Sequence, residues 1–138
     1  MKTDIKTLAS LVATIVWCDG EYSEVERETT EEIIEALELP GDEFRKLIEE
    51  AQAETAALNE DTITEHLEKV AEGVDEEETG VVFETLMQMA LCDGILTGDE
   101  VDNLLLVGDA LGMDTATSVL LLCDMVKEEP ELEISFDA

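Results

Sequence analysis

Two short acidic segments carry the side chains best suited to chemistry in this sequence. Each has the pattern Asp-Gly-x-apolar-hydroxyl-x-x-Glu, and the second copy follows the first after 74 residues without a gap. The pattern matches the second half of an EF-hand calcium loop, which has Asp at its fifth, Gly at its sixth and Glu at its twelfth position. It predicts a site for Ca²⁺ or Mg²⁺ with the ligands Asp19, Glu26, Asp93 and Glu100, and with Glu28 and Asp102 as outer candidates.

The same sequence argues against a complete calcium loop. Apolar side chains stand where the first half of the loop needs oxygen ligands, namely Ile15 and Trp17 in the first copy and Met89 and Leu91 in the second. Ca²⁺ takes about six to eight oxygen ligands, so half a loop needs further oxygens from elsewhere in the chain.

A structural role also explains both turns without a ligand. Glycine readily adopts the left-handed conformation that ends a helix. The hydroxyl of Ser23 or Thr97 can then cap the next helix while Glu26 or Glu100 reaches back to the cap residue, which is a capping box. Capping and cation binding compete for the same glutamates, and the sequence leaves both roles open.

Helices must surround these turns, because apolar residues recur at spacings of three and four on both sides. We predict an all-α chain of about seven helices, in which two pseudo-symmetric units pack as a single bundle. The units cover about residues 3–57 and 76–127, a bridging helix covers about 60–73, and together they form one domain over residues 1–127. Residues 128–138 form a C-terminal tail, in which apolar residues alternate with acidic ones over residues 131–137. This tail is either docked in an extended form or disordered until a partner binds.

The charge of the chain restricts its partners. The 138 residues include 37 acidic and 7 basic side chains, a net charge of −30, and 45% are hydrophobic, which is enough for a buried core. Such a charge opposes binding to nucleic-acid phosphate and favours cations, basic protein surfaces or a highly saline cytoplasm.

No apolar run reaches transmembrane length. Residues 8–17 could pass for a short signal peptide, but the equivalent segment 82–91 recurs in mid-chain, so we expect a cytoplasmic protein.

Histidine and cysteine give no catalytic arrangement. The three cysteines lack a C-x-x-C pattern, and we expect Cys18, Cys92 and Cys123 to be small buried side chains. His66 is the one histidine in the sequence, and we expect it on the exposed side of the bridging helix with no nucleophile beside it. We therefore predict no enzymatic activity.

With both turns and their helices in place, the chain resembles the TerB-like family of tellurite-resistance-associated helical domains. A related unit lies at the amino end of a membrane-anchored DnaJ-type co-chaperone. The resemblance rests on two copies of small-Asp-Gly-x-apolar-[Ser/Thr]-x-x-Glu, each followed by a helix that ends Ala-Leu-x-[Leu/Met], and it covers roughly residues 5–126. Family members often have alanine where this chain has Cys18 and Cys92, which keeps the position small.

The resemblance implies a fold and a set of associations. The fold is a bundle of about seven helices with internal pseudo-symmetry and without established catalytic activity. Divalent-metal binding through acidic residues has been proposed for the family, and its genomic associations are with resistance to tellurite, other chemical stress and phage.

Three hypotheses about function follow. The first is a non-enzymatic acidic module that binds divalent cations and belongs to a stress-response assembly. The alternative is an acidic protein-interaction or adaptor module that binds basic partners without a specific metal site. The third is a helical domain whose acidity is an adaptation to high salt, for which folding would depend on molar KCl.

Overall fold

Seven α-helices form most of the chain that the structure, a computed structural model, describes. The described residues are 3–19, 24–57, 61–92, 94–128 and 133–135, and for 17–19, 95, 99 and 133–135 only the backbone is described. In chain order the elements are α1 (Ile5–Asp19), α2 (Glu24–Ala36), α3 (Gly41–Thr55), α4 (Ile63–Ala71), the short 3₁₀ helix η1 (Glu76–Glu78), α5 (Thr79–Leu91), β1 (Ile95–Thr97), α6 (Gly98–Ala110), α7 (Thr115–Glu128) and β2 (Glu133–Ser135). The predicted all-α class with about seven helices is confirmed.

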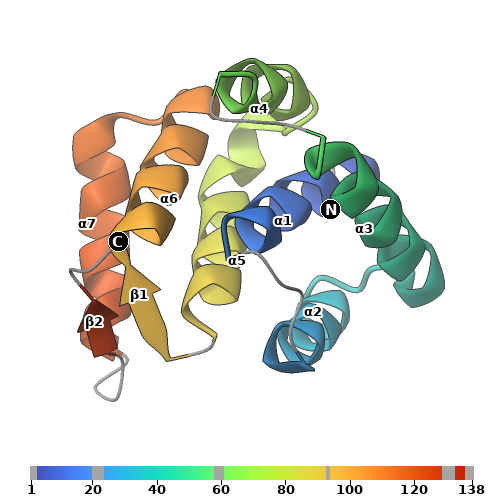
Figure 1. Cartoon of the computed structure of the whole chain (residues 1–138), viewed down its shortest axis with the longest axis horizontal. Helices are drawn as coiled ribbons and strands as arrows, with labels where there is room; N and C mark the ends of the chain where they lie inside the picture. The colour runs from blue at the N-terminus through green and yellow to red at the C-terminus, as the bar shows by residue number, and fades with distance from the viewer. Residues whose placement is uncertain (1–2, 20–23, 58–60, 93, 129–132, 136–138) are drawn as a thin grey trace.

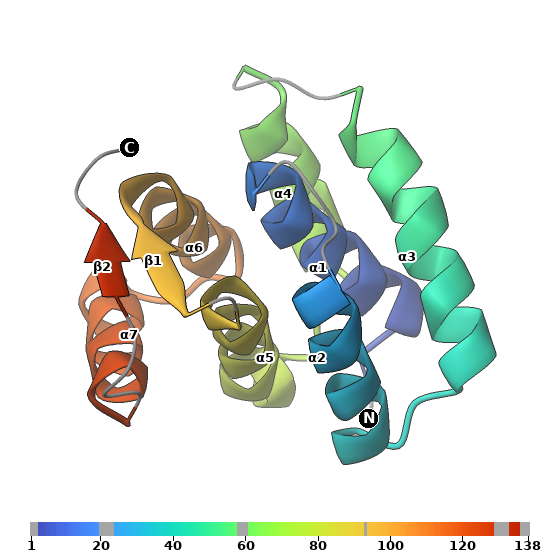
Figure 2. The same cartoon turned by 60° about the horizontal axis from the view of Figure 1, so that its bottom comes forward.

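Helix α1 is buried on every face along its described middle. It packs along α3 and also contacts α4, α5 and α6. Figures 1 and 2 show α1 and α5 side by side in the middle, with α3 beyond α1 and with α6 and α7 beyond α5. One continuous core joins all these helices, and its largest members include Leu8, Leu11, Phe44, Phe83 and Leu86. Because its described middle is buried on all faces, α1 lies at the centre of this core.

In the sequence, one apolar stripe on α1 is formed by Ile5, Leu8, Val12, Ile15 and Val16, which predicts burial of a single face. The structure buries the other faces of the helix as well. The residues between the stripe positions are small or carry hydroxyls, and Ala9, Ser10, Ala13 and Thr14 are all buried. Their small size lets neighbouring helices approach closely. The hydroxyl of Thr14 donates to the carbonyl oxygen of Ser10 at 3.0 Å, so its burial leaves no unsatisfied donor.

The helix starts repeat with the same spacing as the acidic turns. Helices α1, α2 and α3 start at residues 5, 24 and 41, and α5, α6 and α7 start 74 residues later at 79, 98 and 115. The contacts of α1 with α6 and of α2 with α5 are those that a twofold relation would produce. However, α1 packs closely along α3, whereas α5 makes few contacts with α7. Pseudo-symmetry of the two units therefore stays a prediction.

The ends of α2 and α6 share one further feature. Glu38 and Gly112, which are 74 residues apart, both have positive φ angles, of 54° and 81°. In each case the next backbone N–H donates to a carbonyl five residues back, from Leu39 to Ile34 and from Met113 to Gly108, both at 2.9 Å. This is the geometry of a Schellman helix end. The first copy thus uses glutamate where the second uses glycine.

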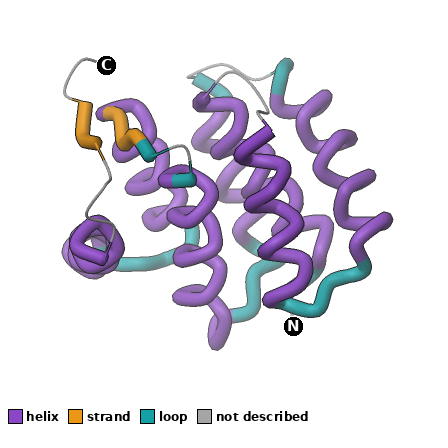
Figure 3. Tube along the Cα trace, turned by 90° about the horizontal axis from the view of Figure 1, so that it is seen from below, coloured by secondary structure: helices purple, strands orange, loops and turns teal. Residues whose placement is uncertain are grey.

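A short parallel strand pair is the main element that the sequence did not predict. Strand β1 pairs with β2, with Ile95 opposite Glu133 and Thr97 opposite Ser135. Figure 3 shows the two strands side by side. The sequence left the tail either docked in an extended form or disordered. Residues 133–135, the described part of the tail, are extended and pair with β1.

Two side chains lie in environments that differ from the predicted ones. Cys123 is exposed, so its predicted burial is wrong, because it faces outward on α7 while Ser118 and Leu122 face the core. His66 is half-buried, and its Nε2 atom is buried without a hydrogen-bond partner among the described residues. Cys92 is half-buried, and the side chain of Cys18 is outside the described part of the chain.

Within the described residues, no helix has the length and apolarity needed to cross a membrane.

Replacing Glu38 with glycine tests the helix end of α2. A non-glycine residue in the left-handed region costs about 1 kcal/mol or more, whereas glycine adopts it freely. We expect Glu38→Gly to raise the free energy of unfolding by roughly 0.5 kcal/mol after the entropic cost of glycine. Urea unfolding measures this change. The control Glu35→Gly, inside α2, should lower stability by about 1 kcal/mol, and an equal loss in both variants would contradict the assignment.

Candidate functional site

The two predicted site glutamates occupy the same position in their helices. Glu26 is the third residue of α2 and Glu100 is the third residue of α6. Their exposed fractions are only 2% and 5%. Among the described carboxylate side chains no other is buried, since the rest are exposed or half-buried. In a chain with 37 acidic residues, burial therefore singles out one glutamate at each acidic turn.

Glu100 forms the predicted capping box at the start of α6. Its Oε1 atom accepts hydrogen bonds from the backbone N–H of Thr97 at 3.2 Å and from the Thr97 hydroxyl at 3.1 Å. The Thr97 hydroxyl oxygen in turn accepts from the backbone N–H of Glu100 at 3.2 Å. Gly94, with a φ angle of 80°, makes the turn that precedes β1 and this cap. The structural role predicted for the second turn is thus confirmed.

Two of the three capping bonds described above reach the Oε1 atom of Glu100. A carboxylate has two oxygens and about four lone-pair positions, so capping and cation binding do not exclude each other chemically.

The first turn is described from α2 onward. Glu26 lies on the buried side of α2 with Thr29, Thr30 and Ile33. The hydroxyl of Thr30 donates to the backbone carbonyl of Glu26 at 2.9 Å, and the hydroxyl of Thr29 donates to the carbonyl of Val25 at 3.0 Å. These bonds satisfy buried hydroxyls within the helix itself.

The described donors alone do not complete a metal site. The side chain of Asp19 and all of Asp93 lie outside the described residues, and the outer candidates Glu28 and Asp102 are exposed. No group of three or more His, Cys, Asp or Glu side chains with metal-site geometry occurs in the described part of the chain. A site for Ca²⁺ or Mg²⁺ at either turn therefore requires Asp19 or Asp93 in addition to the buried glutamate.

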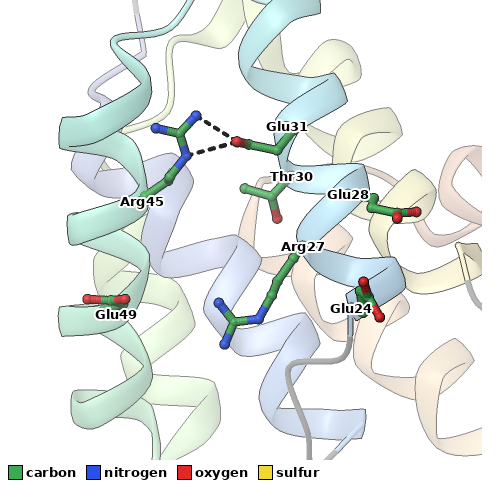
Figure 4. Close-up of a pocket in the computed structure, with 7 residues that line it drawn as sticks. All are labelled: Glu24, Arg27, Glu28, Thr30, Glu31, Arg45 and Glu49. Carbon is green, nitrogen blue, oxygen red and sulfur yellow. Dashed lines mark hydrogen bonds and ion pairs between the residues drawn. The ribbon is translucent and has the colours of Figure 1, made fainter.

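A groove of about 320 Å³ lies between α2 and α3 and holds both arginines of the chain. Figure 4 shows Arg45 of α3 reaching Glu31 of α2, with Arg27 extending between the helices. The Arg45 Nη2 atom lies 2.6 Å from Glu31 Oε1, and its Nη1 atom lies 3.0 Å from Asp42 Oδ1. Exposed ion pairs of this kind contribute roughly 0–1 kcal/mol. We interpret the Arg45–Glu31 pair as a contact that aligns α3 with α2, and the Arg45–Asp42 pair as a contact within α3, rather than as parts of a ligand site.

A second groove, which was not predicted from the sequence, is bounded by three helices. This α2–α5–α7 groove has a volume of about 600 Å³ and is lined by Val25, Glu28, Thr29, Glu32, Gln88, Leu91, Cys92, Gly94, Met125 and Glu128. The α2 members recur at spacings of three and four, which marks one helix face. Because that face mixes apolar and acidic residues, the periodicity of apolar residues alone did not reveal it.

Removal of the Thr97 hydroxyl tests the capping box. Loss of an N-cap hydroxyl typically costs about 1 kcal/mol, so Thr97→Ala should lower the free energy of unfolding by that amount. Chemical unfolding measures the change, with Thr117→Ala on the exposed face of α7 as the control. The control should stay within about 0.5 kcal/mol of the parent protein. Equal stability of Thr97→Ala and the parent would refute the cap.

Comparison with known proteins identifies the family of the chain. The sequence model of a family described as "Tellurite resistance protein TerB" matches residues 6–121, which run from α1 into α7. Searches of the curated proteins and of the solved structures find no significant match. Because the family match covers most of the 138 residues and both acidic turns, the chain belongs to the TerB family.

Proposed function

We propose that this TerB-family chain is a non-enzymatic acidic module that binds Ca²⁺ or Mg²⁺ at its Asp-Gly turns and acts in a cytoplasmic stress-response assembly linked to tellurite resistance. The observation that carries the proposal is the burial of Glu26 and Glu100 at equivalent positions of the two turns. Asp19 and Asp93 precede them by seven residues and would supply the further carboxylates.

Burial of a carboxylate has a cost that binding can offset. Removing an ionised group from water is unfavourable unless hydrogen bonds or an opposite charge compensate for it. The capping bonds of Glu100 provide part of this compensation. A divalent cation at the turn would provide more, and the net charge of −30 would raise the local cation concentration.

A second candidate function is an acidic interaction module that binds basic proteins. The specific observation in its favour is the α2–α5–α7 groove, which carries the glutamates Glu28, Glu32 and Glu128. This role requires surface charge around a groove and does not require the buried turn residues.

Thermal unfolding with and without divalent cations tests the first proposal. At a free cation concentration about one hundred times the Kd, specific binding stabilises the folded state by about 2.7 kcal/mol. We therefore expect millimolar Ca²⁺ or Mg²⁺ to raise the Tm by several degrees above monovalent salt of equal ionic strength. Matching the ionic strength is essential, because any salt screens the self-repulsion of this acidic chain.

Paired variants separate a site from general screening. The double variant Asp19→Asn with Asp93→Asn should lose most of the divalent increment in Tm. The control Asp109→Asn with Asp124→Asn removes the same charge from exposed positions on α6 and α7 and should keep the increment. If both double variants respond alike, or if divalent salt adds nothing beyond monovalent salt, there is no specific site at the turns.

A further inference from the structure

The α2–α5–α7 groove combines apolar side chains with an acidic surround. Val25 on α2, Leu91 on α5 and Met125 on α7 contribute the apolar lining. Leu91 is buried and Met125 is half-buried, but Val25 is 42% exposed, which is high for a valine. Methionine adapts its shape to different partners, which suits a binding surface.

The charged lining of the groove is entirely acidic among the described residues. Glu28 and Glu32 extend from α2, and Glu128 extends from the end of α7. All three are exposed, and no lysine or arginine is among the residues that line the groove. A partner that fills the groove must therefore present positive charge beside its apolar contacts.

The length of the groove fits a short helical segment. Its lining on α2 runs from Val25 to Glu32, which is eight residues and about 10 Å along the helix axis. Two turns of a partner helix cover the same length and place apolar residues at i, i+3, i+4 and i+7 on one face. The volume of about 600 Å³ accommodates a few such side chains while the helix itself remains above the groove.

The C-terminal tail of the chain is not a suitable occupant. Strand β2 pairs with β1, although α7 ends at Glu128 beside the groove. The sequence from Glu129 to Ala138 contains four acidic residues and no basic ones, so it repels the glutamates around the groove.

We propose that the α2–α5–α7 groove binds a basic amphipathic helix of another protein. The apolar face of that helix contacts Val25, Leu91 and Met125, and its lysines or arginines pair with Glu28, Glu32 and Glu128. The inference rests on the interaction role named above as the second candidate, and it does not depend on cation binding at the turns.

Fluorescence anisotropy with the full chain and a labelled synthetic peptide tests this proposal. The probe is an 18-residue peptide with leucine at i, i+3, i+4 and i+7 and lysine at the positions that flank this stripe. The reference is a scrambled peptide of identical composition. At about 0.15 M salt, where exposed charges are screened beyond roughly 8 Å, we expect the striped peptide to bind at least tenfold more tightly. Equal binding of the two peptides, or no binding of either, overturns the proposal.

Matched variants locate the binding surface. Val25→Ser should weaken binding about fivefold. The control Val119→Ser should change the affinity less than twofold. Val119 is a matched control because its exposed fraction of 40% is close to that of Val25. Glu32→Gln with Glu128→Gln should weaken binding at least threefold, and Glu43→Gln with Glu50→Gln on α3 should have little effect. If the groove variants and their controls weaken binding equally, the peptide responds to overall charge and the groove is not its site.

Discussion

Burial of α1 and α5 against each other and against their neighbours holds the fold together. The chain carries a net charge of −30, which opposes any compact state. The shared apolar core must outweigh this repulsion, and it does so with central helices that expose little of their surface. Small residues such as Ala9 and Ala13 allow the close approach that this arrangement requires.

The acidic turns follow from that arrangement. Each central helix is followed by a helix, α2 or α6, whose third residue, Glu26 or Glu100, is buried. At the second turn the carboxylate is used as a cap. Each copy therefore has a buried carboxylate seven residues after its Asp-Gly pair in the sequence, and this links the architecture to the proposed cation binding.

Much of this was predictable from local sequence. The spacing of apolar residues predicts the helices, and Thr97-x-x-Glu100 predicts the capping box because both depend on residues close together in the chain. The pairing of β1 with β2 was not predictable, since it joins residues far apart through backbone groups that carry no side-chain signature. The exposure of Cys123 and the position of the α2–α5–α7 groove depend on which face of each helix packs against another helix. The periodicity of apolar residues alone does not determine which face that is. The side chain of Asp19 and all of Asp93 lie outside the described residues, so their predicted role as ligands stays a prediction.

Paramagnetic broadening by Mn²⁺ tests cation binding at the turns most directly. Mn²⁺ accepts the same carboxylate oxygens as Mg²⁺ and Ca²⁺, and it broadens the amide signals of residues near the bound ion. With substoichiometric Mn²⁺, we expect broadening to be concentrated at Gly20, Gly94 and the first residues of α2 and α6. Excess Mg²⁺ or Ca²⁺ should reverse the broadening. Broadening spread evenly over the exposed glutamates of α2 and α3, with no preference for the turns, would show that no cation site exists there.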